Sequence, residues 1–527
     1  MTPQLNFDCL NQIFKFINED DSTLLYSPSL VNKLWCQVAI PFLWSNPWKF
    51  KNRTNVNLQW KRNILIKTYL SCLYQESREI LINEDFFKEL FSILNEHSSS
   101  QETIKINRND KNLLINNIQN RPMFVYPEFL RHLKLNSLVY AVKFWSNFNL
   151  SGSHRETVYT IALVEMINYL FKKSTCLFTL DIRYCDGEHF QSLQILAHLL
   201  EMSNGNIKSL LELKTFEYDP GTIDRIFKAL SITSQNIKRM PIYPDTVIDD
   251  LTKLIKVQKN LSEVTITHGS YDLWMNYDWK ESDVTNIIIE RANLITCLIL
   301  EDIYFPLSFL SSFVNLKELF LKSISINFKE NWNPLSEIIL PNLQIFHFEP
   351  KNSDMKLISK FIHNNSLELI QIKIKCENIE NPFLTKDLFI IMTNYCQNLT
   401  IYEGPIISIA TNELKEFLKS CKNLLTLHLH SINNNNLNYE NFDNLLNEIS
   451  IIIPKKLTTL IINGRWTITS NSLEIFLKSR ENLFLRKINF YWGSLVNYEG
   501  KFRYICSKYR KKGIVDKRMV ELEGIHI

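Results

Sequence analysis

The stretch Cys421-Lys-Asn-Leu-Leu-Thr-Leu-His-Leu-His430 places leucine at positions 424, 427 and 429. The two-residue step between the last two leucines is that of a strand with alternate side chains buried. The same apolar-x-x-apolar-x-apolar pattern recurs along most of the chain. This stretch is therefore one copy of a repeated structural unit.

The other copies keep the same internal spacing. From Leu177 onward, successive copies begin roughly 21 to 36 residues apart, a period typical of repeat architectures. Copies begin at Leu177, Leu213, Ile237, Leu261, Ile295, Leu316, Leu343, Leu367, Leu424, Leu457 and Leu485. Leu130 is a candidate first copy, Leu399 with Tyr402 is a degraded copy, and the copy at Leu367 continues with Ile370 and Ile372.

Helical spacing of apolar residues separates many of the copies. Examples are 158–171, 190–202, 223–230, 386–395, 412–418 and 442–451. In several copies asparagine precedes the first apolar residue, at Asn260, Asn315, Asn342, Asn398 and Asn423. The array resembles leucine-rich repeats, so we expect an α/β solenoid with a curved parallel sheet inside and helices outside. The alternative is a conventional α/β domain of alternating strands and helices.

The first fifty residues have a different pattern. Apolar residues at 5, 7, 10, 13, 14 and 17 define one face of a helix, which an acidic break at Asp20 and Asp21 interrupts. A short apolar segment and Pro28 follow, and a further helix is expected from Leu30 until Pro41. Three short helices form a very small core, which gains stability by burying apolar surface on a partner.

This N-terminal segment resembles an F-box. The resemblance rests on the 10–17 helix, the acidic break, the stretch Leu30-Val-Asn-Lys-Leu-Trp35 and the end at Leu43 and Trp44. The family usually opens with Leu-Pro, whereas Asn6 follows Leu5 here. The resemblance implies binding to the Skp-type adaptor of a cullin ubiquitin ligase, in a helix-in-groove mode. By this resemblance the docking or supporting residues are Leu5, Leu10, Ile13, Phe14, Ile17, Leu30, Val31 and Trp35. The alternative is an ordinary helical hairpin.

Three regions follow from these patterns. Residues 1–50 are the F-box-like segment, 51–121 a helical linker or N-terminal cap, and 122–527 the leucine-rich-repeat solenoid with a C-terminal cap. Within the linker, helices are expected at 60–74 and 85–94, followed by a serine-containing loop at 97–101.

In each strand, the positions that alternate with the buried ones predict a strip of residues that binds a partner. Their side chains point away from the repeat core, on the inner face of the sheet. The candidate target-binding residues are Asp181, Arg183, Glu301, Lys322, His347, Glu349, Gln371, Lys373, His428, His430 and Tyr491. Glu217, Thr265, Thr267, Asn463 and Asn489 share the same alternation. For any single position, the alternative is a solvated polar residue.

Composition bounds the class of protein. The chain has 527 residues, of which 45% are hydrophobic and 22% charged, so it can bury a large core. A net charge of +4 and only 11 glycines argue against whole-protein polyanion binding and against a glycine-rich phosphate-binding enzyme. No nucleotide-binding, nucleophile-elbow or zinc-protease motif is present, so we expect no catalytic residue and no cofactor.

The ten scattered cysteines and the absence of a signal pattern or a long apolar run predict an intracellular protein, cytoplasmic or nuclear. No membrane partner is expected. His428 and His430 share a strand face but lack further metal ligands in sequence. The aromatic segment at 271–279 is interpreted as loop packing or a partner hot spot, and the basic stretch at 501–518 as a terminal cap or a nucleic-acid contact.

Together these features predict a substrate receptor: the F-box-like segment binds the adaptor, and through it a cullin, while the repeats bind an unknown target protein. One alternative is an F-box scaffold that has no part in ubiquitination. A second is a nucleic-acid-associated repeat protein that uses the basic C-terminal stretch, although nucleic acid is not the expected partner.

Overall fold

The computed structural model describes residues 5–48, 56–76, 122–149, 155–183, 189–203, 206–220, 222–243, 249–267, 283–303, 307–324, 333–350, 355–375, 384–406, 410–431, 440–463, 466–479, 487–491 and 500–512. By internal contacts the chain forms two units. The first comprises Met1–Leu261 and Ser282–Ile287, and the second Ser262–Glu281 and Ile288–Ile527. The three regions expected from the sequence remain predictions.

The N-terminal segment, residues 5–48, is helical. Its elements are α1 (Phe7–Asp21), the 3-10 turn η1 (Ser22–Leu25), α2 (Tyr26–Ser29) and α3 (Lys33–Ser45). Two asparagines cap the longer helices: Asn6 Oδ1 accepts from the Cys9 amide at 2.9 Å, and Asn32 Oδ1 from the Trp35 amide at 3.0 Å. Asn6 therefore has a structural role as the cap of α1. The helix predicted from Leu30 to Pro41 is wrong at both ends, because α3 begins at Lys33 and continues through Pro41 to Ser45.

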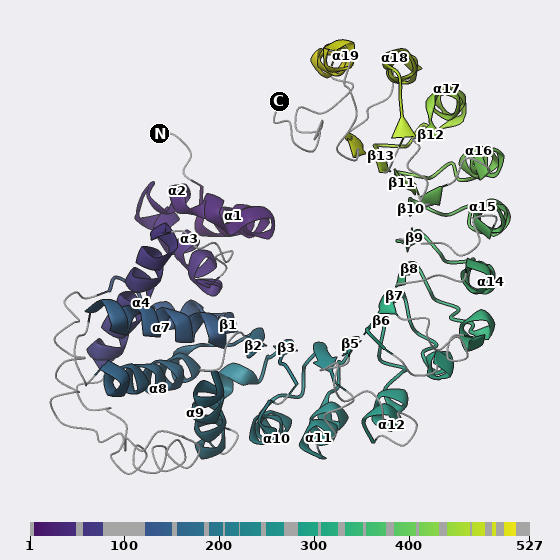
Figure 1. Ribbon diagram of the computed structural model, residues 1–527. Coiled ribbons are helices and arrows are strands. Elements are labelled where there is room, and N and C mark those ends of the chain that lie inside the picture. The colour runs from purple at the N-terminus through teal and green to yellow at the C-terminus, as the bar shows by residue number, and fades with distance from the viewer. Residues whose placement is uncertain are drawn as a thin grey trace. The chain divides into compact units, whose positions relative to one another are not determined.

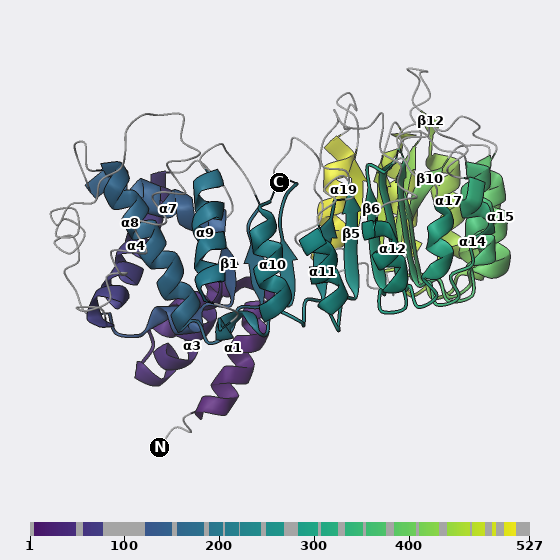
Figure 2. The same ribbon diagram turned by 90° about the horizontal axis from the view of Figure 1, so that it is seen from below.

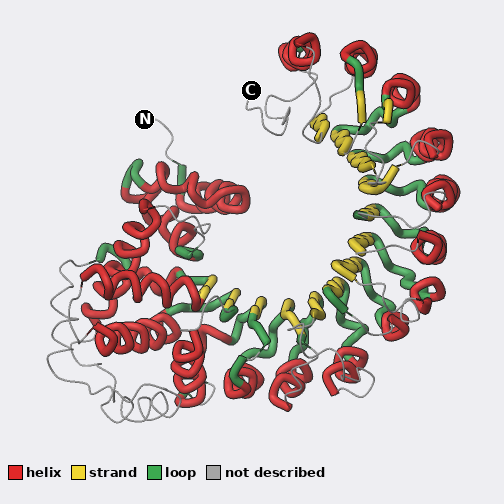
Figure 3. Tube along the Cα trace, in the orientation of Figure 1, coloured by secondary structure: helices red, strands yellow, loops and turns green. Residues whose placement is uncertain are grey.

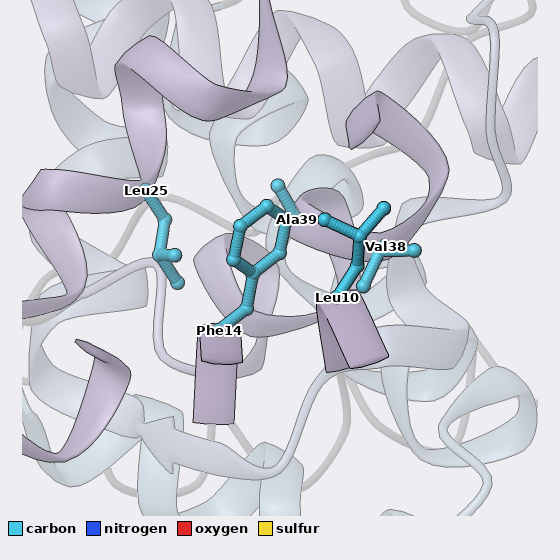
Figure 4. Close-up of a cluster of buried hydrophobic side chains, with 5 residues drawn as sticks. All are labelled: Leu10, Phe14, Leu25, Val38 and Ala39. Carbon is cyan, nitrogen blue, oxygen red and sulfur yellow. The ribbon is translucent and has the colours of Figure 1, made fainter. Parts of the chain in front are cut away.

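A small apolar core holds this segment together (Figure 4). Its buried residues are Leu10, Phe14, Leu25, Val38 and Ala39. Leu10 and Phe14 lie one turn apart on α1 and face α3, and the Phe14 ring meets Trp35 edge-on at 5.5 Å. Packing of α3 on this core explains how the helix continues past Pro41, whose missing N–H would otherwise favour an end.

Aromatic side chains join the N-terminal segment to the rest of the first unit. The Trp44 ring lies 5.3 Å from that of Tyr69 on α4 (Val56–Glu76) and 4.0 Å from that of Tyr126. The Ser45 carbonyl also accepts from the Arg131 amide at 2.9 Å. The helix predicted at 60–74 is thus confirmed as part of α4, while 85–94 and 97–101 lie outside the described residues.

The first unit continues as strands and helices in alternation. Its further elements are η2 (Tyr126–Phe129), β1 (His132–Lys134), α7 (Leu135–Asn149), α8 (Arg155–Lys173), β2 (Thr179–Asp181), α9 (His189–Met202), η3 (Lys208–Leu210), β3 (Thr215–Glu217), α10 (Asp224–Thr233), β4 (Arg239–Ile242) and α11 (Asp249–Val257). The strands pair in parallel in the order β1-β2-β3-β4. Helices α9 to α11 lie on one side of this strand row (Figure 1).

The second unit repeats the same plan. Its elements are β5 (Glu263–Thr267), α12 (Asp283–Glu290), which spans the boundary, β6 (Cys297–Glu301), η6 (Leu307–Ser312), β7 (Glu318–Ile324), η8 (Asn333–Glu337), β8 (Ile345–Pro350), α14 (Met355–Asn364), β9 (Gln371–Ile374), α15 (Leu384–Tyr395), β10 (Ile401–Ile406), α16 (Thr411–Ser420), β11 (Thr426–Ser431), β12 (Glu440–Asn441), α17 (Asp443–Ile452), β13 (Thr459–Asn463), β14 (Trp466–Thr467), α18 (Ser470–Ser479), β15 (Lys487–Tyr491) and α19 (Gly500–Lys511). Strands β5 to β11, β13 and β15 pair in parallel in chain order, and β12 pairs with β14.

Within the second unit, the strands lie on the inner side of a curve and the helices on the outer side (Figure 3). Turned by 90°, the same helices run alongside the strands (Figure 2). The α/β solenoid predicted from the repeat spacing is therefore confirmed. It also explains why each repeat is stable only in a stack, since one strand and one helix cannot bury a core alone.

The leucine motif marks the buried positions almost throughout. In the opening copy, Leu424, Leu427 and Leu429 are all fully buried, and so are the three apolar residues of the candidate first copy at Leu130. One copy was placed wrongly by sequence: Leu367 is 81% exposed, while Leu369, Ile372 and Ile374 are buried. Three apolar residues in four positions, Leu367, Leu369 and Ile370, allow two registers, and only packing selects between them.

The degraded copy at Leu399 also forms a full strand, β10. Its third apolar position is Gly404, and a Cβ there would clash with the ring of Tyr402, which fills the space instead. Tyr402 is fully buried and lies against Phe389 and Phe417. The departure from the motif is therefore a local exchange of volume between two neighbouring core positions.

Asparagines connect successive repeats on the surface. The side-chain amides of Asn315 and Asn342 donate to the carbonyls of Asn293 and Val314, in the preceding repeats, at 2.8 and 2.9 Å. In the first unit, Asn260 donates to Asn236 Oδ1 at 3.1 Å. We call these bonds the asparagine ladder. It accounts physically for the asparagine that precedes the first leucine in several copies.

Among the described helices, none is long and apolar enough to cross a membrane.

Candidate partner-binding surfaces

The N-terminal segment exposes an unusual number of large apolar side chains. They are Leu5, Phe7, Ile13, Phe16, Leu24, Tyr26, Leu30 and Val31, defined here as the N-terminal apolar surface. Leu30 is 71% exposed and Phe16 is 70% exposed. So many exposed apolar side chains in so short a segment of sequence make this a candidate partner-binding surface.

The predicted docking residues separate into two groups. Leu5, Ile13, Leu30 and Val31 are exposed and belong to the N-terminal apolar surface. The other four, Leu10, Phe14, Ile17 and Trp35, form the small core or pack against it. They hold the helices in place, and the first four side chains stay exposed. The sequence alone did not single out Phe16 or Tyr26, although Phe16 falls outside the core face of α1 by its helical spacing.

On the first unit, the inner strand positions carry paired charges. Arg183 Nε and Nη2 donate to the two carboxylate oxygens of Asp181 at 3.0 and 2.8 Å. Arg183 Nη1 lies 3.5 Å from Glu217, which in turn lies 3.8 Å from Arg239. The hydrogen bonds that Arg183 donates to Asp181, with the charges of the nearby carboxylates, raise the pKa of Arg183 despite burial. The predicted residues Asp181 and Arg183 thus form one ion-pair network.

On the second unit, the inner positions of β8 to β13 form a connected polar surface. We call it the polar platform, made of His347, Glu349, Gln371, Lys373, Lys375, Glu403, His428, His430 and Asn463. The strand register places His347, Lys373, Glu403 and His428 side by side across four neighbouring strands. Side chains opposite each other in adjacent strands are close enough to interact directly.

A hydrogen-bonded chain crosses the centre of the platform. His428 Nδ1 lies 3.0 Å from Glu403 Oε1, and Asn463 Nδ2 lies 2.8 Å from His428 Nε2. A carboxylate can only accept and an amide nitrogen only donate, so this geometry places one imidazole proton on Nδ1. Lys373 Nζ is 4.0 Å from the other Glu403 oxygen. Burial alone would raise the pKa of Glu403, but the His428 bond and the nearby cations outweigh it and lower the pKa.

A second pair lies next to this chain. Gln371 Nε2 is 2.5 Å from His347 Nε2, so the imidazole accepts there, and the Phe320 ring meets His347 edge-on at 4.5 Å. Burial is the main cause that lowers the pKa of His347 to about 4, and the charge of Lys373 is the second. The imidazole is therefore uncharged at neutral pH.

His430 and Lys375 complete the platform. Burial lowers the pKa of His430 to about 4. Its Nε2 atom is buried and has no hydrogen-bond partner within the described part of the chain. Lys375 Nζ pairs with Glu349 at 2.9 Å, and this bond raises the pKa of Lys375.

Six of the predicted target-binding residues lie on the platform: His347, Glu349, Gln371, Lys373, His428 and His430. Sequence analysis missed Glu403 and Lys375. Glu403 belongs to the degraded copy, and Lys375 follows the copy that was placed two residues early. In both cases a strand register drawn from the neighbouring repeats would have found them, because every strand contributes the same inner positions.

The remaining predicted residues lie beside the platform or away from it. Glu301 and Lys322 are register neighbours on β6 and β7, and Lys322 is the neighbour of Glu349 on β8. The β7–β8 register shifts between Lys322 and Ile324, where Ser323 has a φ of 51°. Such a bulge redirects the end of a strand. Tyr491 is on β15 opposite Asn463, but its side chain lies outside the described residues.

The basic C-terminal stretch is described only as far as residue 512. Its helix α19 buries Ile505 and Tyr509, and Lys508 pairs with Glu474 on α18 at 2.6 Å. The aromatic segment at 271–279 lies outside the described residues. Within the described ranges, no group of three or more His, Cys, Asp or Glu side chains is placed to hold a metal ion.

The motif, the parallel pairing and the helix placement define the chain as an α/β solenoid built of leucine-rich repeats. No protein-family model matches the chain, and no curated protein matches its sequence. Solved structures similar to part of it include an internalin from Listeria monocytogenes, with 14% identity and a TM-score of 0.31 over 54% of this chain and 74% of that one. Another is the leucine-rich-repeat ectodomain of the receptor kinase GASSHO1/SCHENGEN3 from Arabidopsis thaliana, in complex with CASPARIAN STRIP INTEGRITY FACTOR 2. It has 11% identity and a TM-score of 0.29 over 68% of this chain and 42% of that one.

Proposed function

We propose that this chain is the substrate-recognition subunit of a Skp/cullin/F-box type ubiquitin ligase. The N-terminal segment is the F-box and binds the Skp-type adaptor, and the repeats bind a target protein. The chain performs no bond chemistry itself; it holds the target close to the transferring enzyme and so raises its effective concentration there.

The observation that carries this proposal is the N-terminal apolar surface. Five residues form the core of the segment, while eight large apolar side chains stay exposed over its first 31 residues. A segment built in this way gains free energy when a partner's apolar groove covers it, at roughly 25 cal/mol per Å² of apolar area removed from water. The F-box resemblance identifies the adaptor as that partner.

Adaptor retention tests the proposal. The full-length chain is purified with the Skp-type adaptor, and a double variant, Ile13→Asp with Leu30→Asp, is compared with it. Both side chains are exposed, so the variant keeps its core, and we expect adaptor affinity to fall at least about tenfold because charge enters an apolar contact. Leu10→Asp would be a poor test, since Leu10 is fully buried.

Ile232→Asp is the matched control, because Ile232 is 62% exposed on α10 of the same unit. It should retain the adaptor as the parent chain does. Failure of the parent chain to bind the adaptor, or undiminished binding by the double variant, overturns the proposal. Adaptor binding without target ubiquitination in a reconstituted assay would instead favour an F-box scaffold.

A further inference from the structure

The polar platform has almost no charge left to offer a partner. Glu403 is paired with His428 and faces Lys373, and Glu349 is paired with Lys375. Paired charges gain little from a charged ligand, because each new contact must compete with an existing one. A strongly acidic or basic partner therefore finds no complementary field on this surface.

Uncharged hydrogen-bonding groups, in contrast, are concentrated here. The Gln371 amide, the Asn463 amide and the imidazoles of His347 and His430 lie on β8 to β13. Because the His430 Nε2 atom is buried without a partner, its hydrogen-bonding capacity is unused in the free protein. An unsatisfied buried polar group destabilises the free protein, by about 1–3 kcal/mol in general.

The two ends of this polar region are apolar. On one side Phe320 is the register neighbour of His347, and Ile299 is the neighbour of Phe320 one strand further out; on the other side Ile461 is the neighbour of His428. All three side chains are partly exposed. A ligand that crosses the strands would thus meet an apolar contact, a polar centre and a second apolar contact.

From this arrangement we infer that the polar platform binds an extended, uncharged segment of a partner protein, through the segment's peptide groups and its Asn, Gln, Ser or Thr side chains. This inference rests on the proposed function and specifies the chemistry of the target. Crossing from β7 to β13 covers five strand intervals, or roughly 24 Å. An extended chain covers that distance with about seven residues.

Peptide selection on the full-length chain tests the inference. A phage-displayed library of random peptides of about ten residues is selected against the protein, and the enriched peptides are synthesised for calorimetry. We expect sequences of low net charge, rich in amide and hydroxyl side chains, with affinities that change less than about threefold between 50 and 500 mM NaCl. Acidic or basic sequences with a steep salt dependence would overturn the inference, and so would a selection that yields no binder or a preference for oligonucleotides.

Two variants place the peptides on the platform. His347→Ala with His428→Ala should weaken binding at least about tenfold, and Gln371→Glu should do the same by introducing a charge in nearly the same volume. The control, Lys415→Ala with Glu448→Ala, removes a 2.6 Å pair on the outer helices and should leave affinity unchanged. Thermal melting verifies that each variant is folded. If the double variant His347→Ala with His428→Ala is not folded, Gln371→Glu alone tests the inference. Undiminished binding by Gln371→Glu contradicts the inference.

Adaptor retention, measured on the same samples, separates the two proposals. If the chain binds the adaptor but selects charged peptides, only the inference is overturned. If the chain does not bind the adaptor, the proposed function is overturned.

Discussion

The N-terminal apolar surface and the polar platform differ in what they leave exposed. On the first, large apolar side chains surround a five-residue core and have no cover. On the polar platform, none of the described inner strand positions carries an exposed large apolar side chain. Its polar groups already form hydrogen bonds with one another. Apolar contact is strong but tolerant of geometry, whereas a hydrogen-bonded surface discriminates between ligands. The molecule thus has one surface suited to a constant partner and another suited to a selected one.

The largest expected effect comes from the small core beneath the N-terminal apolar surface. Phe14→Ala should destabilise the N-terminal segment by about 3–5 kcal/mol, because a fully buried ring is removed from a core with few other members. Hydrogen exchange of the α1 and α3 amides measures this change, and adaptor retention should fall with it.

Phe16→Ala is the matched control on the same helix, since Phe16 is 70% exposed. Its effect on stability should stay within about 0.5 kcal/mol. Equal losses in the two variants would show that α1 is not packed as described.

Glu403→Gln gives an intermediate effect on the polar platform. The change keeps the shape but removes the charge that His428 and Lys373 face, and we expect a loss of about 1–2 kcal/mol at pH 7 in denaturant unfolding. Because the pKa of Glu403 is lowered from 4.5, its carboxylate stabilises the fold above that pH. This contribution is lost as the pH falls through the lowered pKa.

The unfolding free energies of the parent chain and of Glu403→Gln should therefore become equal in acid. Glu448→Gln provides the comparison, because Glu448 is half-exposed on the outer helices and its pair with Lys415 should contribute under about 0.5 kcal/mol. A Glu403→Gln variant as stable as the parent at pH 7 would exclude the proposed network.

His430 should give a pH-dependent effect. Its pKa is lowered from 6.5 to about 4 next to His428, Asn463, Glu403 and Lys375. Between these values the unfolded chain binds a proton that the folded chain does not, so stability should decrease as the pH falls from about 6.5 to about 4.

His430→Leu should flatten this part of the stability curve without loss at pH 7, because it removes an unpartnered polar group. Thr426→Leu, at another inner position of β11, should leave the slope as it is. A His430→Leu variant with the parent's slope would show that this imidazole is not the titrating group.

The smallest expected effect on stability is at the N-terminal apolar surface, which is proposed to bind the adaptor. Leu30→Asp should change the free energy of unfolding by less than about 0.5 kcal/mol, because Leu30 is 71% exposed, yet it should weaken adaptor binding. Paired melting and binding measurements test this separation. A large destabilisation would mean that Leu30 supports the fold.

Much of this architecture could be predicted from the sequence, because leucine spacing reports burial directly. The strands fall where the motif predicts them, including the copies at Leu130 and Leu399. The misplaced copy at Leu367 shows the limit of prediction from leucine spacing. Leu367, Leu369 and Ile370 are all apolar, so the sequence permits two strand registers. Similarly, helical spacing identified α1 but could not separate Phe14, which faces α3, from Ile13, which faces outward. That distinction depends on which helix packs against which face, and a single helix pattern does not contain it.

The platform was predicted as a strip of residues and not as a network. Alternation placed His347 and His428 on the inner face, but their partners Gln371 and Asn463 come from neighbouring strands. Pairing across strands depends on register, which the repeats fix only after they are stacked. The lowered pKa values of His347 and His430 follow first from burial in the stacked repeats, and so were equally out of reach.

The asparagine ladder bears on how the protein is made. In each of its bonds the side-chain donor belongs to the later repeat and the acceptor to the earlier one. During synthesis the chain emerges from its N-terminus, so the acceptor is already in place when its asparagine leaves the ribosome. Each new repeat can therefore dock on a finished one, and the array can fold in the order in which it is translated.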